Sequence, residues 1–123
     1  MRLTMSALPK TWIFDLDGTL VVHNGYKMGG DKLLPGVKEF MVKIPISDYI
    51  LIITSRRREE EAGTVDFLNR EGIRFNKILF EMPMGERILF NDDKTSGLPM
   101  AYSVRHKRNV GLKDVDVIID ETL

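Results

Sequence analysis

The chain contains no cysteine among its 123 residues. Disulfide bonds, thiolate zinc sites and a cysteine nucleophile are therefore all excluded. It also lacks an excess of charge of either sign, because 18 basic side chains balance 18 acidic ones. Nucleic acids and anionic membranes are bound through a positive surface, so a neutral chain predicts neither partner.

Long apolar runs are missing as well. No stretch approaches the roughly 20 apolar residues that a membrane span needs. The first ten residues lack the apolar centre of a signal peptide. We therefore expect a cytoplasmic protein without a membrane partner. The length predicts one domain over 1–123, and contents of 43% hydrophobic and 29% charged residues are typical of a globular protein.

Short, largely apolar runs alternate with stretches of helical periodicity. The runs at 11–14 and 49–53 are typical of strands that are buried on both faces. Further strands are expected at 78–80, 87–90 and 101–104. Pro35 and the apolar residues spaced after it predict a helix that Pro45 ends, and a second helix is expected over 59–70.

The other segments are expected to be less regular. We expect residues 1–9 to form a short arm and the glycine-rich residues 21–31 to form a loop or small hairpin. Residues 115–119 are expected to form either a sixth strand or part of a closing helix. Strands that alternate with helices predict an α/β fold, here a Rossmann-like three-layer sandwich around a mostly parallel sheet. Such sheets bind ligands at the carboxyl ends of their strands.

Three polar clusters follow three of the apolar runs, at 15–19 (Asp-Leu-Asp-Gly-Thr), 54–56 (Thr-Ser-Arg) and 91–94 (Asn-Asp-Asp-Lys). In a parallel sheet these clusters would converge. Asp15 and Asp17 are two positions apart, so both would point the same way from an extended segment. Two carboxylates at so short a distance repel each other, and a divalent cation between them would relieve the repulsion. Asp92 would be a third ligand of that cation. Such an oxygen donor set suits Mg²⁺ better than zinc.

These clusters resemble the motifs of the haloacid dehalogenase (HAD) superfamily. Residues 12–20 (WIFDLDGTL) resemble motif I, Thr54 after the apolar run 49–53 resembles motif II, and 91–93 (NDD) after 87–90 resemble motif IV. The resemblance extends from residue 12 to about residue 104. It implies a single HAD-like hydrolase domain.

The resemblance also implies an activity and a role for each matching residue. The protein would be a Mg²⁺-dependent phosphohydrolase that acts on a small phosphorylated metabolite, with a sugar phosphate as one candidate. Asp15 would attack phosphorus and form an aspartyl-phosphate, and Asp17 would protonate the leaving oxygen and then activate water. Thr54 would bind the phosphoryl group. Asp15, the backbone carbonyl of Asp17 and Asp92 would hold Mg²⁺.

One element of the family pattern is missing, namely the lysine of motif III. At its expected place the chain has Glu81-Met-Pro83, which keeps the proline and lacks the lysine. A phosphate dianion beside several carboxylates needs a cation besides the metal. Our first candidate for this catalytic role is Lys94, directly after motif IV. Lys77 is second, because it begins a predicted strand and so would lie at the wrong end of the sheet.

The short interval between motif I and the first helix resembles the capless members of the family. Residues 21–31 would then be a small flap over an open site, and a homo-oligomer is one way to cover such a site. Candidate substrate-binding residues are Ser55, Arg56 and His23. An equal alternative for Arg56 is a solvated surface position. An equal alternative for His23 is that it is an ordinary polar loop residue without a functional role.

Two other functions fit the same residues. Without the motif III lysine, the chain would be a catalytically weak module that binds Mg²⁺ and a phosphorylated ligand, or an accessory to an enzyme complex. With an open site, it would be a phosphatase of macromolecular substrates.

Overall fold

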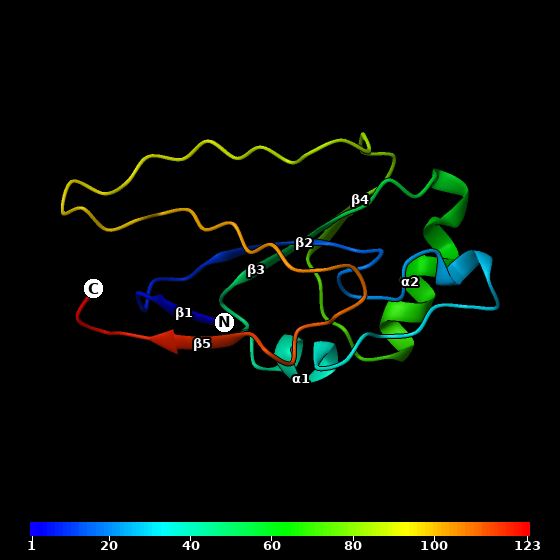
Figure 1. The fold of residues 1–123 in the computed structure, drawn as a ribbon, viewed down its shortest axis with the longest axis horizontal. Helices are drawn as coiled ribbons and strands as arrows, with labels where there is room; N and C mark the ends of the chain where they lie inside the picture. The colour runs from blue at the N-terminus through cyan, green and yellow to red at the C-terminus, as the bar shows by residue number, and fades with distance from the viewer.

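The computed structural model describes all residues, 1–123, and its centre is a three-stranded parallel sheet (Figure 1). The strands β2 (Thr11–Asp15), β3 (Tyr49–Ile53) and β4 (Lys77–Leu79) lie in the order β2-β3-β4. Two of them coincide with the apolar runs predicted at 11–14 and 49–53, and the third matches the strand expected at 78–80. The expectation of an α/β fold with mostly parallel strands is therefore confirmed.

The two ends of the chain form a second, smaller sheet. The strands β1 (Arg2–Met5) and β5 (Asp116–Ile119) pair in parallel, with Arg2 opposite Asp116 and Met5 opposite Ile119. The prediction of an arm over residues 1–9 is thus wrong. Of the two alternatives for 115–119, the structure has the strand. Figure 1 shows this pair at one end of the molecule, and α2 at the other.

Both predicted helices are present. They are α1 (Val37–Val42) and α2 (Glu61–Arg70), the latter entered through a 3-10 turn, η2 (Arg58–Glu60). Their buried faces contribute Val37 and Leu68 to a core that also contains Ile50 and Ile52 of β3. None of the helices has the length and apolarity needed to cross a membrane.

The flap, which we define as residues 21–31, is a loop with one 3-10 turn, η1 (Gly25–Lys27). It is anchored at its start by Val21, whose side chain is fully buried in the core. The backbone N–H of Val22 donates to the carbonyl of Lys32 at 3.0 Å, which brings the two ends of the flap together. The loop interpretation of 21–31 is therefore confirmed.

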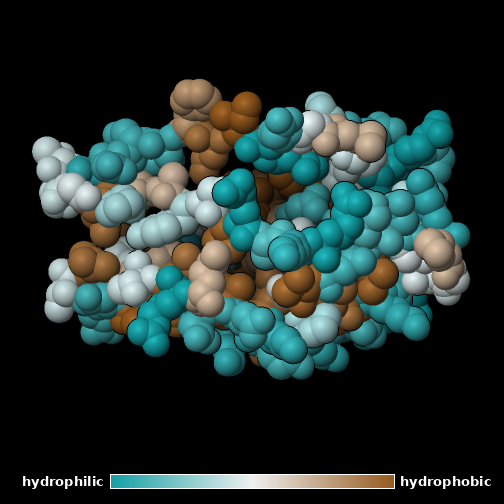
Figure 2. Space-filling model, in the orientation of Figure 1, coloured by the Kyte–Doolittle hydropathy of each residue, from teal (hydrophilic) through white to brown (hydrophobic).

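Residues 82–106, the long loop, form no helix or strand. The strands predicted at 87–90 and 101–104 are therefore wrong. The run 87–90 is apolar enough for a strand, but no neighbouring strand pairs with it, and Ile88 and Phe90 are 78% and 89% exposed. A strand needs partners for its backbone N–H and C=O groups, and apolar composition alone does not supply them. Hydrophobic atoms protrude where this loop runs along the upper edge of the molecule (Figure 2).

A tight backbone contact joins the C-terminal segment to the start of α1. Gly111 has a φ of 86°, and a Cβ at this position would overlap the backbone of Pro35. The N–H of the next residue, Leu112, donates to the carbonyl of Pro35 at 2.8 Å. Glycine is thus required at position 111 for two reasons, the left-handed backbone conformation and the close approach of the two segments of the chain.

We expect Gly111→Ala to lower the free energy of unfolding by more than the roughly 1–2 kcal/mol that left-handed backbone alone costs an L-residue. The matched control is Gly63→Ala in α2, where a Cβ would meet no atom within 4 Å. That change should raise the free energy of unfolding by about 0.5–1 kcal/mol. Urea unfolding curves of the two variants measure both effects. Equal stability of the variants would contradict the contact.

Candidate functional site

The first two polar clusters meet at the carboxyl ends of neighbouring strands, as predicted. Asp15 is the last residue of β2 and is paired in register with Ile53, the last residue of β3, which Thr54 follows. The Asp15 side chain is 37% exposed, and its Oδ2 accepts a hydrogen bond from the hydroxyl of Thr19 at 3.1 Å. Asp15 is therefore a carboxylate that a ligand in solution can reach.

Thr54 lies deeper than Asp15. Its side chain is fully buried, and its Oγ1 accepts a hydrogen bond from the backbone N–H of Arg56 at 3.1 Å. Ser55, between them, is half-buried. The Thr54 hydroxyl keeps its own proton free to donate, because the bond to Arg56 uses only a lone pair. This threonine thus shapes the turn after β3 and presents a donor beneath the surface.

Arg56 is the best-satisfied polar group of the site. Its side chain is 2% exposed, and all five N–H donors of its guanidinium are used. Nε and Nη2 donate to the two carboxylate oxygens of Asp17 at 3.0 and 2.9 Å. Nη1 and Nη2 donate to the two oxygens of Asp31 at 2.9 and 2.7 Å. The fifth donor binds Thr64 Oγ1 in α2 at 2.9 Å.

An aromatic ring completes the surroundings of this guanidinium. The ring of Tyr26, in η1 of the flap, lies 4.1 Å from the Arg56 guanidinium carbon. A cation at this distance from an aromatic face is attracted by the negative potential of the ring. Tyr26 and Asp31 both belong to the flap, so the flap is held to the sheet through Arg56. We call Arg56, Asp17, Asp31, Thr64 and Tyr26 the guanidinium network.

The network shifts the titration of Arg56. Burial by itself would lower the pKa of Arg56, but the hydrogen bonds and negative charges of Asp31 and Asp17 outweigh burial and raise this pKa above its ordinary value. A group whose pKa rises on folding contributes its full stability below the unfolded pKa and loses it only as the pH rises through the folded one. Arg56 is therefore a permanent cation, and its contribution is constant around neutral pH.

This arrangement corrects the expected role of Arg56. The sequence left two alternatives, a ligand for an anionic substrate or a solvated surface position, whereas the donors of Arg56 are all used inside the protein. Only its neighbours Arg57 and Arg58 are exposed. The burial follows from Asp17 and Asp31, because two carboxylates that flank one guanidinium offset the cost of removing its charge from water.

His23 is placed beside motif I by a segment that the sequence did not connect with the site. Its backbone N–H donates to Oδ1 of Asn109 at 2.8 Å, and the N–H of Asn109 donates to the carbonyl of Gly18 at 2.9 Å. The Nδ1 atom of His23 is buried without a partner. Asn109 has a φ of 67°, a left-handed conformation that asparagine tolerates better than most residues. The preference of asparagine for such turns was the one local feature of the sequence that could have drawn attention to Asn109.

The third polar cluster is not brought to the site. Asp92 and Lys94 are exposed in the long loop, where the N–H of Lys94 donates to the carbonyl of Leu98 in a turn. No three His, Asp or Glu side chains are grouped so that they could hold a metal ion. The structure thus does not unite Asp92 with Asp15 and Asp17. Lys77 begins β4 in register with Leu51 at the middle of β3, so it lies two positions short of the carboxyl edge at which Asp15 ends β2.

The cation nearest to Asp15 is one that the sequence interpretation missed. Arg87 Nη1 lies 3.4 Å from Asp15 Oδ1, and the two side chains are exposed to a similar degree. Arg87 was assigned to a predicted strand, which would have placed it at the far end from motif IV. In the long loop it is free to reach back to β2.

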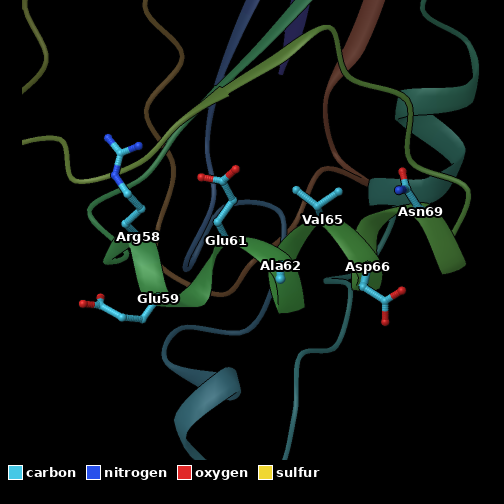
Figure 3. Close-up of a pocket in the computed structure, with 7 residues that line it drawn as sticks. All are labelled: Arg58, Glu59, Glu61, Ala62, Val65, Asp66 and Asn69. Carbon is cyan, nitrogen blue, oxygen red and sulfur yellow. The ribbon is translucent and has the colours of Figure 1, made fainter.

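A shallow hollow elsewhere on the surface does not include the predicted residues. It runs along η2 and α2, with the side chains of Arg58, Glu61 and Asn69 among those that line it (Figure 3). Its lining is mixed in charge and mostly polar. Asp15 and Thr54 lie outside this hollow, at the carboxyl edge of the sheet.

We compared the chain with known protein families, curated proteins and solved structures. No family model, no curated protein and no solved structure matches the chain.

We expect Arg56→Met to lower the free energy of unfolding by about 3–5 kcal/mol, since it leaves Asp17 and Asp31 as unpaired, largely buried charges. The matched control is Arg57→Met, one residue along. Its side chain is 83% exposed and forms only a surface pair with Glu59, so the effect should stay within about 0.5 kcal/mol. Urea unfolding measures both values, and similar losses in the two variants would contradict the network.

Proposed function

We propose that this protein is a phosphohydrolase of the HAD type, with Asp15 as the nucleophile. The observation that carries the proposal is the position of Asp15, a solvent-accessible carboxylate at the carboxyl end of β2, beside Thr54 at the end of β3. Ligand sites of parallel sheets lie at this edge. The hydroxyl of Thr19 donates to Oδ2 of Asp15 and Arg87 lies beside Oδ1, while the side chain stays 37% exposed.

The proposed reaction has two displacements at phosphorus. An oxygen of Asp15 attacks the phosphoryl group, the bond from phosphorus to the ester oxygen breaks, and the leaving oxygen takes up a proton. Water then attacks the aspartyl-phosphate, which releases inorganic phosphate and a proton and restores the carboxylate. Asp17 is the proposed proton donor and acceptor. Each of its oxygens accepts from Arg56 and retains a further lone pair.

Arg87 is our proposed replacement for the missing motif III lysine. Its guanidinium lies beside Asp15, where it would offset the charge of an incoming phosphate dianion. Cations placed near a transferring phosphoryl group stabilise the charge on its equatorial oxygens. Lys94, the candidate chosen from sequence, lies in the turn of the long loop that Leu98 closes.

Magnesium is part of the proposal as a requirement to be tested. The three predicted ligands do not fit as a set in this arrangement, because Asp92 lies in the exposed long loop and is not grouped with Asp15 and Asp17. Of the expected ligands, Asp15 is the one whose accessible side chain lies at the carboxyl edge of the sheet.

The proposal extends to the finer features inferred from the family resemblance. These are a Rossmann-like three-layer sandwich without a cap, a cytoplasmic location, a small phosphorylated metabolite such as a sugar phosphate as substrate, and a homo-oligomeric state.

A second candidate is a module that binds a phosphorylated ligand without turnover. The specific observation in its favour is the pairing of Asp17 with Arg56, which ties up the proposed acid and base. This candidate predicts ligand binding by a protein that releases no phosphate.

We expect wild-type protein to release phosphate from a panel of phosphorylated metabolites in the presence of Mg²⁺, and Asp15→Asn to abolish the release. The asparagine keeps the size of the side chain but cannot form the aspartyl-phosphate. A chelator provides the metal-free comparison. Calorimetric binding without turnover in a folded wild type would favour the second candidate instead.

We further expect Arg87→Gln to lower kcat/KM by about 100-fold, in the range found when a group that stabilises transition-state charge is removed. Lys94→Gln, an identical loss of charge in the same loop, should have a much smaller effect. The measurement is steady-state phosphate release by the two variants side by side. The reverse order would restore Lys94 to the role predicted from sequence.

A further inference from the structure

We propose that Arg56 is a positioning residue that couples the flap to Asp17. It orients Asp17 and holds the flap closed with the same guanidinium, so that opening the flap releases part of its hold on Asp17. The inference rests on the proposed function for the role of Asp17. Its structural part, the link between flap and Asp17, is independent of that function.

The contact with Asp17 fixes the direction of a carboxylate. Nε and Nη2 of Arg56 donate to separate oxygens of Asp17, which is the two-pronged geometry that only arginine provides. Such a pair sets the plane of the carboxylate as well as its distance. The Asp17 side chain remains 17% exposed, so its free edge faces outward while Arg56 holds it from within.

The contact with the flap uses two of the three remaining donors, and the third binds Thr64 in α2. Asp31 accepts from both Nη atoms of Arg56, and Tyr26 covers the guanidinium with its ring. The other side-chain hydrogen bond between the flap and the rest of the protein is the one from the His23 backbone to Asn109. Arg56 is therefore the main side-chain tie of the flap.

Sharing one guanidinium makes the two contacts dependent on each other. When the flap moves away, Arg56 loses two of its five hydrogen bonds and the contact with the ring. It then holds Asp17 and Thr64 alone and can turn about its long side chain. Asp17 would be correctly oriented only while the flap is closed, which coordinates proton transfer with enclosure of the substrate.

The first test removes the flap contact and leaves Asp17 untouched. Asp31→Asn keeps the size of the side chain but loses its charge and one hydrogen bond to Arg56. We expect faster hydrogen exchange at the amide of Val22, which binds the Lys32 carbonyl across the base of the flap. The carboxyl ¹³C signal of Asp17 should change as well, because Arg56 is hydrogen-bonded to both carboxylates.

The second test removes the two-pronged geometry and keeps the charge. We expect Arg56→Lys to lower kcat about 10- to 100-fold, with KM little changed and an altered pH profile, because misplacing a catalytic group costs that much. Arg57→Lys, its exposed neighbour, is the control. A melting curve establishes that each variant is folded.

The outcomes separate the two proposals. A folded Asp31→Asn protein with wild-type exchange at Val22 and an unchanged Asp17 signal would overturn the coupling, and so would wild-type kcat and pH profile in folded Arg56→Lys. A wild type that hydrolyses no substrate would overturn the phosphohydrolase proposal alone. The exchange and carboxyl signals would still decide whether Arg56 links the flap to Asp17.

Discussion

The cost of burying one positive charge is the constraint on which the site depends. Removing a guanidinium from water costs several kcal/mol unless partners replace the lost hydration. Arg56 meets this requirement with five hydrogen bonds that come from three places in the chain, namely the turn after β2, the flap and α2. None of these three segments can shift without leaving a donor of Arg56 unsatisfied, so the cation defines how they are arranged.

The same network gives Asp15 and Asp17 different surroundings. Asp17 and Asp31 are two carboxylates paired with one guanidinium, and the ion pair with Arg56 keeps Asp17 inside a largely buried group. Asp15 is outside it, half-exposed, with Arg87 as its nearest cation. Residues two positions apart on one strand end thus have different surroundings, one polar and enclosed, the other open to solvent. This difference in surroundings agrees with the separate roles proposed above for the two side chains.

Sequence predicted those parts of the fold that depend on local pattern. The apolar runs of β2 and β3 and the periodicity of α2 are local signals, and all three elements were located to within a few residues. The pairing of β1 with β5 was not predictable, because its partners lie at opposite ends of the chain and Arg2–Met5 has no apolar run. The strand expected at 87–90 was wrong for the same reason, since pairing depends on a neighbour.

The site residues that follow the ends of strands were predicted from the sequence. Those whose position depends on charged residues far away in the chain were missed. Asp15 and Thr54 follow from the two strands that precede them. Nothing local distinguishes the buried Arg56 from the exposed Arg57, because the difference lies in Asp31, 25 residues away. Arg87 was overlooked for a similar reason, its contact with Asp15 spanning 72 residues.

The exposed run of Ile88, Leu89 and Phe90 has a consequence for how the protein behaves at high concentration. Three consecutive apolar residues of high strand propensity with unpaired backbone are a template on which chains aggregate. Charged residues stand on both sides of this run, Glu86 and Arg87 before it and Asp92 to Lys94 after it. Such flanking charges act as gatekeepers, since stacked copies would bring like charges together. The cluster at 91–94 therefore has a use in solubility that needs no ligand at all.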